Sequence, residues 1–99
     1  MAQFDVYRVP STGGLAVDVQ SDLLNHLRTR LVIPLLEGTD SDWPMPRLAP
    51  KVEVDGKLFT LATPFMIGVP LAELGGVAGS LSGQGYEIMA AVDVLLTGI

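Results

Sequence analysis

The one histidine of the chain, His26, follows shortly after Ser21 and Asp22, and these three residue types can together carry out nucleophilic catalysis. Such catalysis requires a nucleophile, a base within hydrogen-bonding distance and a group that orients the base. Ser21 and Asp22 come directly after a predicted strand, where serine and aspartate commonly form turns or caps. The pattern therefore favours a solvent-exposed turn over a catalytic triad.

Metal and phosphate sites have little support in the sequence. The chain has no Cys and one His, whereas zinc needs several nitrogen or sulfur ligands. Gly75, Gly76 and Gly79 are spaced G-G-x-x-G, but the Lys and the Ser or Thr of a phosphate-binding loop are missing, and Ser80 has no neighbouring cation. We interpret these glycines as a flexible connection, and we expect no catalytic residue, no metal site and no cofactor.

Two arginines and two aspartates offer an alternative chemistry. Arg28 and Arg30 could hold a phosphate while Asp18 and Asp22 supply acid–base groups, as a small ribonuclease requires. The simpler interpretation makes Arg28 and Arg30 charges of a loop and of a strand edge. Six Lys and Arg against eleven Asp and Glu give a net charge of −5, which opposes binding to a phosphate backbone. The sequence therefore favours a protein-binding function without direct contact to nucleic acid.

Alternating apolar and polar residues predict most of the strands that must position these groups. The alternation covers residues 3–7 and 15–20, with a glycine-containing hairpin loop at 10–14. An apolar run at 30–35 is typical of a central strand. Residues 51–54 and 57–62 flank Asp55-Gly56, a pair that favours a type I′ hairpin turn because both positions need positive φ. Residues 65–68 are predicted to form a short further strand.

The end of the chain changes to helical spacing. Pro70 is predicted to begin a single helical turn over residues 71–74, which Gly75-Gly76 ends. From Gln84 onward, apolar side chains recur every three or four positions, namely Ile88, Met89, Val92, Leu95, Leu96 and Ile99. The predicted fold is mainly β (α+β), an antiparallel barrel or rolled sheet closed by a C-terminal helix, in one domain spanning residues 1–99.

The composition indicates a cytoplasmic, self-associating protein. Of the 99 residues, 48% are hydrophobic and 17% are charged, against roughly 25% charged in typical soluble domains. The absence of Cys fits a reducing compartment, and the start of the chain has no secretory signal pattern. The longest apolar stretch, residues 88–96, is interrupted by Asp93 and is too short to span a bilayer, so we expect no membrane association.

The segment at residues 37–50 has no clear periodicity and contains Trp43 between prolines and polar residues. Its prolines stiffen it. Trp43 could be a partner-binding side chain, but the favoured interpretation is a lid that folds back over the barrel.

Several ordered stretches resemble the CcdB family of toxins. They are Q-F-D-V-Y at residues 3–7, V-D-V-Q-S-D-L-L at 17–24, R-L-V-I-P-L at 30–35, V-P at 69–70 and the final G-I. The resemblance implies an SH3-like barrel with a small extra sheet and a C-terminal helix, arranged as a homodimer. Family members belong to plasmid and chromosomal toxin–antitoxin modules. They bind the A subunit of DNA gyrase, trap the cleaved-DNA complex without catalysing a reaction, and are released by a cognate CcdA-like antitoxin.

The resemblance also implies which residues bind gyrase. A Trp-Gly-Ile tail is typical of the family, together with an apolar pair after the Q-S-D motif. The residues of this chain at the corresponding positions are Leu23, Leu24, Asp93, Leu96, Thr97, Gly98 and Ile99. Leu96 stands where Phe is common, Asp93 where Asn is frequent, and Thr97 where the Trp is expected.

The replacement of Trp by Thr97 leaves three interpretations open. Loss of an interface Trp typically costs about 2–4 kcal/mol, or roughly 30- to 1,000-fold in affinity. The protein is then a weakened or inactive relative, a binding protein with another target, or a toxin whose gyrase has adapted. A ribonuclease like the MazF toxins, which share the barrel, is a further alternative. For the tail itself, the structural alternative is that Leu95, Leu96 and Ile99 complete a dimer core.

Overall fold

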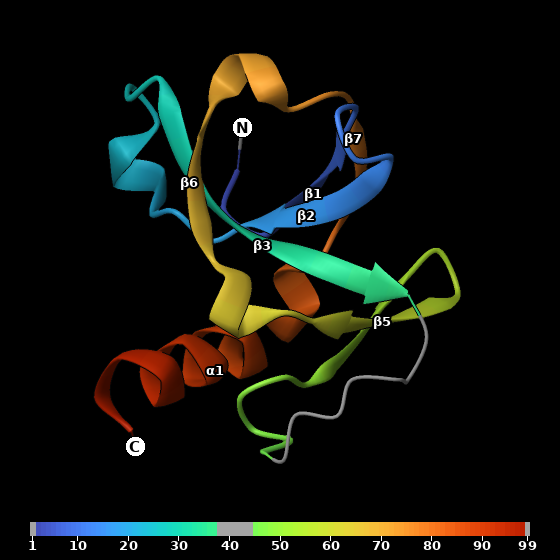
Figure 1. Ribbon diagram of the computed structural model, residues 1–99. Coiled ribbons are helices and arrows are strands. Elements are labelled where there is room, and N and C mark those ends of the chain that lie inside the picture. Colours follow the sequence, from blue (N-terminus) through green and yellow to red (C-terminus); the bar gives the residue numbers. More distant parts are fainter. Residues whose placement is uncertain (1, 38–44, 99) are drawn as a thin grey trace.

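The strands form one antiparallel sheet that curls around a concave side and carries a helix on its other side (Figure 1). The structure, a computed structural model, describes residues 2–37 and 45–98. Its strands are β1 (Asp5–Val9), β2 (Gly14–Asp18), β3 (Thr29–Glu37), β4 (Lys51–Val54), β5 (Lys57–Leu61), β6 (Ile67–Pro70) and β7 (Val77–Ser80). Its helices are α1 (Gly85–Thr97) and the short 3-10 turns η1 (Asp22–Leu24), η2 (Thr63–Phe65), η3 (Leu71–Glu73) and η4 (Ser82–Gln84). This half-barrel with a C-terminal helix confirms the predicted mainly β (α+β), SH3-like class.

Strand β3 organises the sheet because it pairs with three other strands. The sheet order is β4-β5-β3-β2-β1-β7, and β6 pairs with β3 outside this path. Residues 32–35 of β3 pair with β2. On the other edge, residues 29–32 pair with β6 and residues 35–37 with β5. The chain therefore leaves β5, makes the turn η2 and continues as β6 along the same edge of β3.

The predicted hairpin turn between β4 and β5 is confirmed. Asp55 has φ +51° and Gly56 has φ +79°, as a type I′ turn requires. In the β1–β2 hairpin the positive φ belongs to Gly13, at +74°, whereas Gly14 already lies in β2. Trp43 lies outside the described residues.

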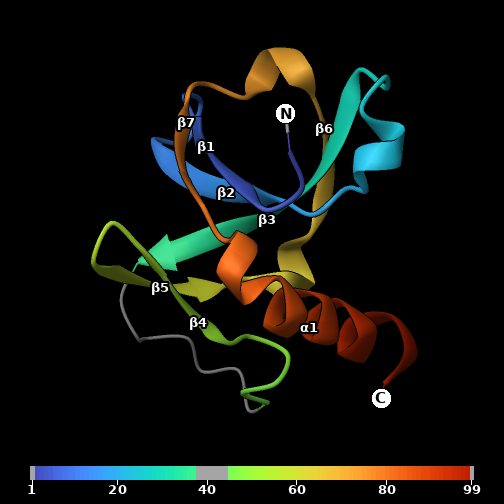
Figure 2. The same ribbon diagram turned by 180° about the vertical axis from the view of Figure 1, so that it is seen from behind.

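The main core lies between the convex face of the sheet and α1. The alternation of the strands sends Val6, Val17, Ile33 and Leu35 to this face, where they are buried with Ile88 of the helix. Figure 2, the view from behind, shows α1 lying along this face. Burial of these apolar side chains is the main stabilising contribution to the fold.

The concave face of the sheet is buried as well. The side chains that alternate with the core residues include Tyr7, Asp18 and Arg30, which are 4%, 0% and 1% exposed. The turn η3 connects β6 to the segment leading into β7 and covers this side of the sheet (Figure 1). Polar positions of an alternating strand are usually solvated, but here the curled sheet encloses them.

The interpretation of residues 75–79 as a flexible connection is wrong. Residues 77–80 form β7, which pairs with β1 through Asp5↔Ser80, Val6↔Gly79 and Tyr7↔Val77. The glycines permit close backbone approach: a Cβ at Gly75 would lie 3.1 Å from the carbonyl oxygen of Arg8. The predicted strand at 65–68 is also displaced, to Ile67–Pro70, because Thr63–Phe65 form a 3-10 turn.

The C-terminal helix is confirmed, and the structure defines its buried face. Its buried residues are Ile88, Ala91, Val92 and Val94. Leu95 and Leu96 are 37% and 68% exposed, so they are not part of the core of one chain. Among the described residues, no helix has the length and apolar character needed to cross a membrane.

Candidate partner-binding surfaces and a buried ion pair

The first candidate surface is the turn η1, which exposes two adjacent leucines. Leu23 is 87% exposed and Leu24 is 43% exposed. The Ser21 hydroxyl caps the turn by accepting a hydrogen bond from the Leu23 amide at 3.2 Å, and Asp22 Oδ1 accepts one from the amide of Gln3 at 2.7 Å. The predicted role of Ser21 and Asp22 as turn and cap formers is confirmed. His26 is an exposed residue of the same loop.

The second candidate surface is the last turn of α1. Asp93, Leu96, Thr97 and Gly98 are all exposed. The Thr97 hydroxyl donates a hydrogen bond to the Asp93 carbonyl oxygen at 2.7 Å, so it is satisfied within its own helix. Gly98 ends the helix with φ +78° and donates its amide to the Val94 carbonyl oxygen at 2.9 Å. Ile99 lies outside the described residues.

These two surfaces remain separate within one chain. The loop that carries η1 joins the Thr29 end of β3, where Thr29 pairs with Pro70 of β6. The other end of β6 follows η2, which packs against α1. In Figures 1 and 2, η1 lies beside β6, and the end of α1 lies at a lower level on the same side of the molecule. The predicted gyrase-binding residues therefore form two patches.

Apolar side chains of η2, β6 and β3 are also exposed. Phe65 of η2 is 57% exposed and Ile67 of β6 is 55% exposed. Leu31, at the start of β3, is 36% exposed. Isolated exposed apolar residues are common, and these do not share one face: Ile67 pairs with Val32 and lines the concave cavity, whereas Leu31 lies on the opposite face of β3.

The structure corrects the interpretation of Arg30 as a strand-edge charge. Its side chain is buried, and its Nε lies 3.0 Å from Oδ2 of Asp18, which is fully buried as well. Burial raises the pKa of Asp18, while the hydrogen bond from the Gln20 amide and the guanidinium of Arg30 act in the opposite direction. Arg28 is exposed, unlike Arg30. The two arginines therefore do not form one phosphate-binding site.

The sequence missed this ion pair because the two residues lie on different strands. Asp18 ends β2 and pairs in register with Val32, two residues beyond Arg30 on β3. Asp18 occupies the polar phase of an alternating strand, whereas Arg30 begins a run that is otherwise apolar, so neither residue signals a buried ion pair. The curl of the sheet, which encloses that face, is not visible in such a pattern.

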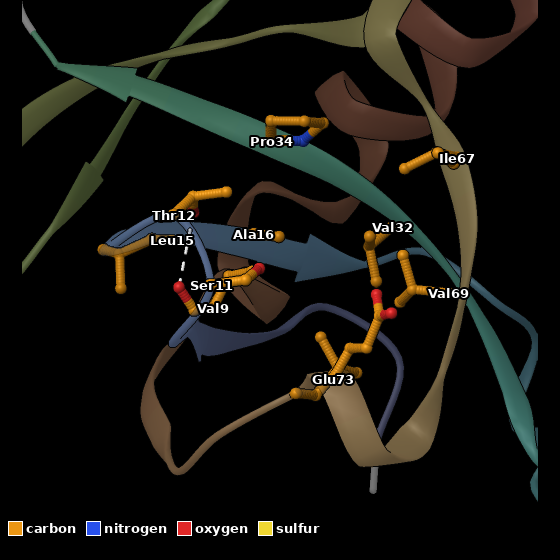
Figure 3. Close-up of a pocket in the computed structure, with 11 residues that line it drawn as sticks. Val9, Ser11, Thr12, Leu15, Ala16, Val32, Pro34, Ile67, Val69 and Glu73 are labelled. Carbon is orange, nitrogen blue, oxygen red and sulfur yellow. Dashed lines mark hydrogen bonds between the residues drawn. The ribbon is translucent and has the colours of Figure 1, made fainter.

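A cavity of about 210 Å³ lies on the concave side of the sheet. Figure 3 shows its apolar walls, which include Val32, Ile67 and Val69, and the carboxylate of Glu73 directed toward Val32 and Val69. The Thr12 hydroxyl at its rim accepts a hydrogen bond from the Gly14 amide at 3.1 Å. The cavity offers apolar walls and a single carboxylate, and His26 is not among the residues that line it.

No group of three or more His, Cys, Asp or Glu residues with the arrangement of a metal site occurs in the part of the chain that the structure describes. The described residues also present the exposed leucine turn η1 and the end of α1, and they hold the buried Asp18–Arg30 ion pair.

Comparison with known proteins agrees with the sequence resemblance. The family model described as "CcdB protein" matches residues 3–98. Among solved structures, an "Endoribonuclease from Mycobacterial species" superimposes with a TM-score of 0.77 at 17% identity, covering 97% of this chain and 90% of that one. At this identity the similarity shows a shared fold. The family match extends over nearly all of the sequence, and the chain belongs to the CcdB family of toxin–antitoxin toxins.

Proposed function

We propose that this protein poisons DNA gyrase by binding its A subunit and trapping the cleaved-DNA complex, and that a cognate CcdA-like antitoxin neutralises it. The proposal assigns no chemical step to the toxin. The observation that carries it is the exposed Leu23–Leu24 pair, at the position where the family has its apolar gyrase-binding pair. Leu23 is 87% exposed on a turn held by a serine cap.

The proposal includes a cytoplasmic homodimer. Leu95 and Leu96 on α1 and Phe65 on η2 are exposed in the single chain, which is unfavourable unless a partner covers them. In a dimer, the leucine turns and helix ends of two copies can contribute to one binding surface. Sedimentation of the purified protein tests this: a dimer is expected, and a monomer at micromolar concentration would refute it.

Thr97 supports a second candidate, a binding protein of the same fold that keeps the antitoxin and no longer poisons gyrase. Its hydroxyl is bonded within the helix, and a threonine cannot stack on a partner's guanidinium as a tryptophan can. Binding of the antitoxin without an effect on gyrase would support this candidate.

A ribonuclease function has less support. Arg30, the arginine that such a site would need, is buried against Asp18, and the similarity to an endoribonuclease is one of fold at 17% identity. Intact RNA after incubation with the purified protein would dismiss this function.

The test of gyrase poisoning is a cleavage assay with purified gyrase and supercoiled plasmid. We expect linear DNA to accumulate with the wild-type protein and not with Leu23→Asp. Leu58→Asp is the matched control, because Leu58 is also an exposed leucine, at 51%, but lies on β5. Addition of the cognate antitoxin is expected to abolish cleavage. Absence of linear DNA with folded wild-type protein would exclude the poisoning mechanism.

A further inference from the structure

We propose that Arg30 positions the partner-binding turn η1 through Asn25, so that an ion pair inside the sheet determines how Leu23 and Leu24 are presented. The inference rests on the proposed function, in which these leucines contact gyrase. Arg30 is in this view a positioning residue, because its buried side chain touches no partner.

The first step is the fixed placement of the guanidinium. Arg30 is 1% exposed and lies on the enclosed face of β3. Its Nε is 3.0 Å from Oδ2 of Asp18, and Asp18 Oδ1 accepts the amide of Gln20 at 2.9 Å. The planar guanidinium presents its N–H groups in fixed directions. Attraction to the Asp18 carboxylate and burial on the enclosed face therefore hold the guanidinium in place, although Nε and Oδ2 do not form a hydrogen bond.

The second step is the bond from Arg30 to the turn. Arg30 Nη2 donates a hydrogen bond to Oδ1 of Asn25. Asn25 caps the C-terminal end of η1, directly after Leu24, and its amide donates to the Asp22 carbonyl oxygen at 3.3 Å. A hydrogen bond from a charged donor is stronger than one between neutral groups. The side chain of Asn25 thus ties the end of the leucine turn to the interior of the sheet.

The third step is that the other bonds from this loop to the rest of the chain reach residues that are only partly buried: Asp22 Oδ1 accepts the amide of Gln3 at 2.7 Å, and the Arg28 carbonyl oxygen accepts the amide of Leu71 at 2.9 Å. Residues 21–29 are all exposed. Gln20 donates from Nε2 to the Leu24 carbonyl oxygen at 3.1 Å and accepts the Leu31 amide at Oε1, but it is only partly buried. Within the described part of the chain, the bond to Arg30 is the one that joins η1 to a fully buried side chain.

The consequence for binding is one of preorganisation. When an exposed loop becomes ordered only on binding, the entropy that it loses lowers the affinity. A loop that is already held in place avoids this cost. Loss of the Asn25 acceptor also leaves Arg30 Nη2 buried without a partner, beside Nη1, which has none among the described residues. The loop and the guanidinium would both rearrange.

Variants of Asn25 test the inference while both residues of the ion pair, Asp18 and Arg30, are kept. Asn25→Ala removes the acceptor, whereas Asn25→Asp replaces the amide oxygen by a carboxylate oxygen that can still accept from Arg30. We expect Asn25→Ala to bind the gyrase A subunit about tenfold more weakly and Asn25→Asp to bind like the wild type. His26→Ala, a truncation of the next exposed residue of the loop, is the control and is expected to change affinity little.

Hydrogen exchange provides a readout that does not depend on gyrase. The amides of Leu24, Asn25 and Leu27 are donors within the turn, and we expect them to exchange faster in Asn25→Ala than in Asn25→Asp, while amides of β2 and β3 stay protected. Unchanged exchange in Asn25→Ala would overturn the positioning role, and so would changed exchange with unchanged affinity. If the wild type fails to bind gyrase A, the proposed function fails, and the exchange experiment still decides whether Arg30 holds the turn.

Discussion

At the scale of single residues, the chemistry of the chain is decided by what its polar side chains already contact. Arg30 is committed to Asp18 and Asn25, and Ser21 caps η1. Thr97 is bonded to the carbonyl oxygen of Asp93. Arg30, Ser21 and Thr97 are therefore occupied with holding the sheet, the loop and the helix end.

Thr97→Trp is predicted to strengthen binding to the gyrase A subunit. The ring would add apolar area and a surface that can stack on a cation, a gain of roughly 30-fold when the partner offers such a site. Calorimetric titration measures this, with Thr97→Val as the control because it removes the hydroxyl without adding a ring. Equal or weaker binding of Thr97→Trp would show that the gyrase surface is adapted to a small residue.

Tyr7 is predicted to ionise at a higher pH than an ordinary phenol. Burial raises the pKa of Tyr7, the nearby carboxylates of Asp5 and Asp18 raise it further, and Arg30 acts in the opposite direction. Because the unfolded chain loses this proton first, the folded protein is expected to lose stability as the pH rises above the usual phenol range. Tyrosinate absorbance against pH checks this in Tyr86→Phe, where Tyr7 is the remaining tyrosine. If Tyr7 in this variant ionised at the ordinary pKa of a phenol, the prediction would be refuted.

At the scale of elements, strongly periodic segments could be predicted from the sequence and the others could not. The hairpin at Asp55-Gly56 and the helix from residue 85 carry their own local signals. Strand β7 has the short sequence V-A-G-S and is defined by its pairing with β1 and by close packing, since a Cβ at Gly79 would lie 3.2 Å from Cγ1 of Val54. Such tertiary pairing leaves no periodic signal in the sequence.

The same limit applies to the candidate site. The leucine pair could be located by its resemblance to the family motif, and its exposure agrees with a binding role. The burial of Arg30 could not be foreseen, because it depends on the curl of the sheet and on a partner residue from another strand.

The helix face gives a prediction at this scale. Val92 is 6% exposed and packs in the core, whereas Leu95 is 37% exposed. Val92→Asp is expected to lower the free energy of unfolding by about 3 kcal/mol or more, because an unpaired carboxylate is buried. Leu95→Asp is expected to leave the monomer folded and to weaken self-association. Chemical denaturation and sedimentation measure the two effects, and equal destabilisation by both substitutions would contradict the assigned face.

At the scale of the whole molecule, a small acidic protein exposes apolar side chains on several elements, η1, η2, β6 and the end of α1 among them. A net charge of −5 disfavours direct attraction to a nucleic-acid backbone. The surface therefore favours protein partners, with a second copy of the chain, the antitoxin and the gyrase A subunit as the proposed ones.

The most direct test of this account is a titration of purified gyrase A subunit with the purified protein. The account predicts saturable binding that Leu23→Asp abolishes and that Leu58→Asp leaves unchanged, with both variants as stable as the wild type. Absence of binding by the folded wild-type protein, or equal binding by both variants, would contradict the claim that the exposed leucine turn recognises gyrase.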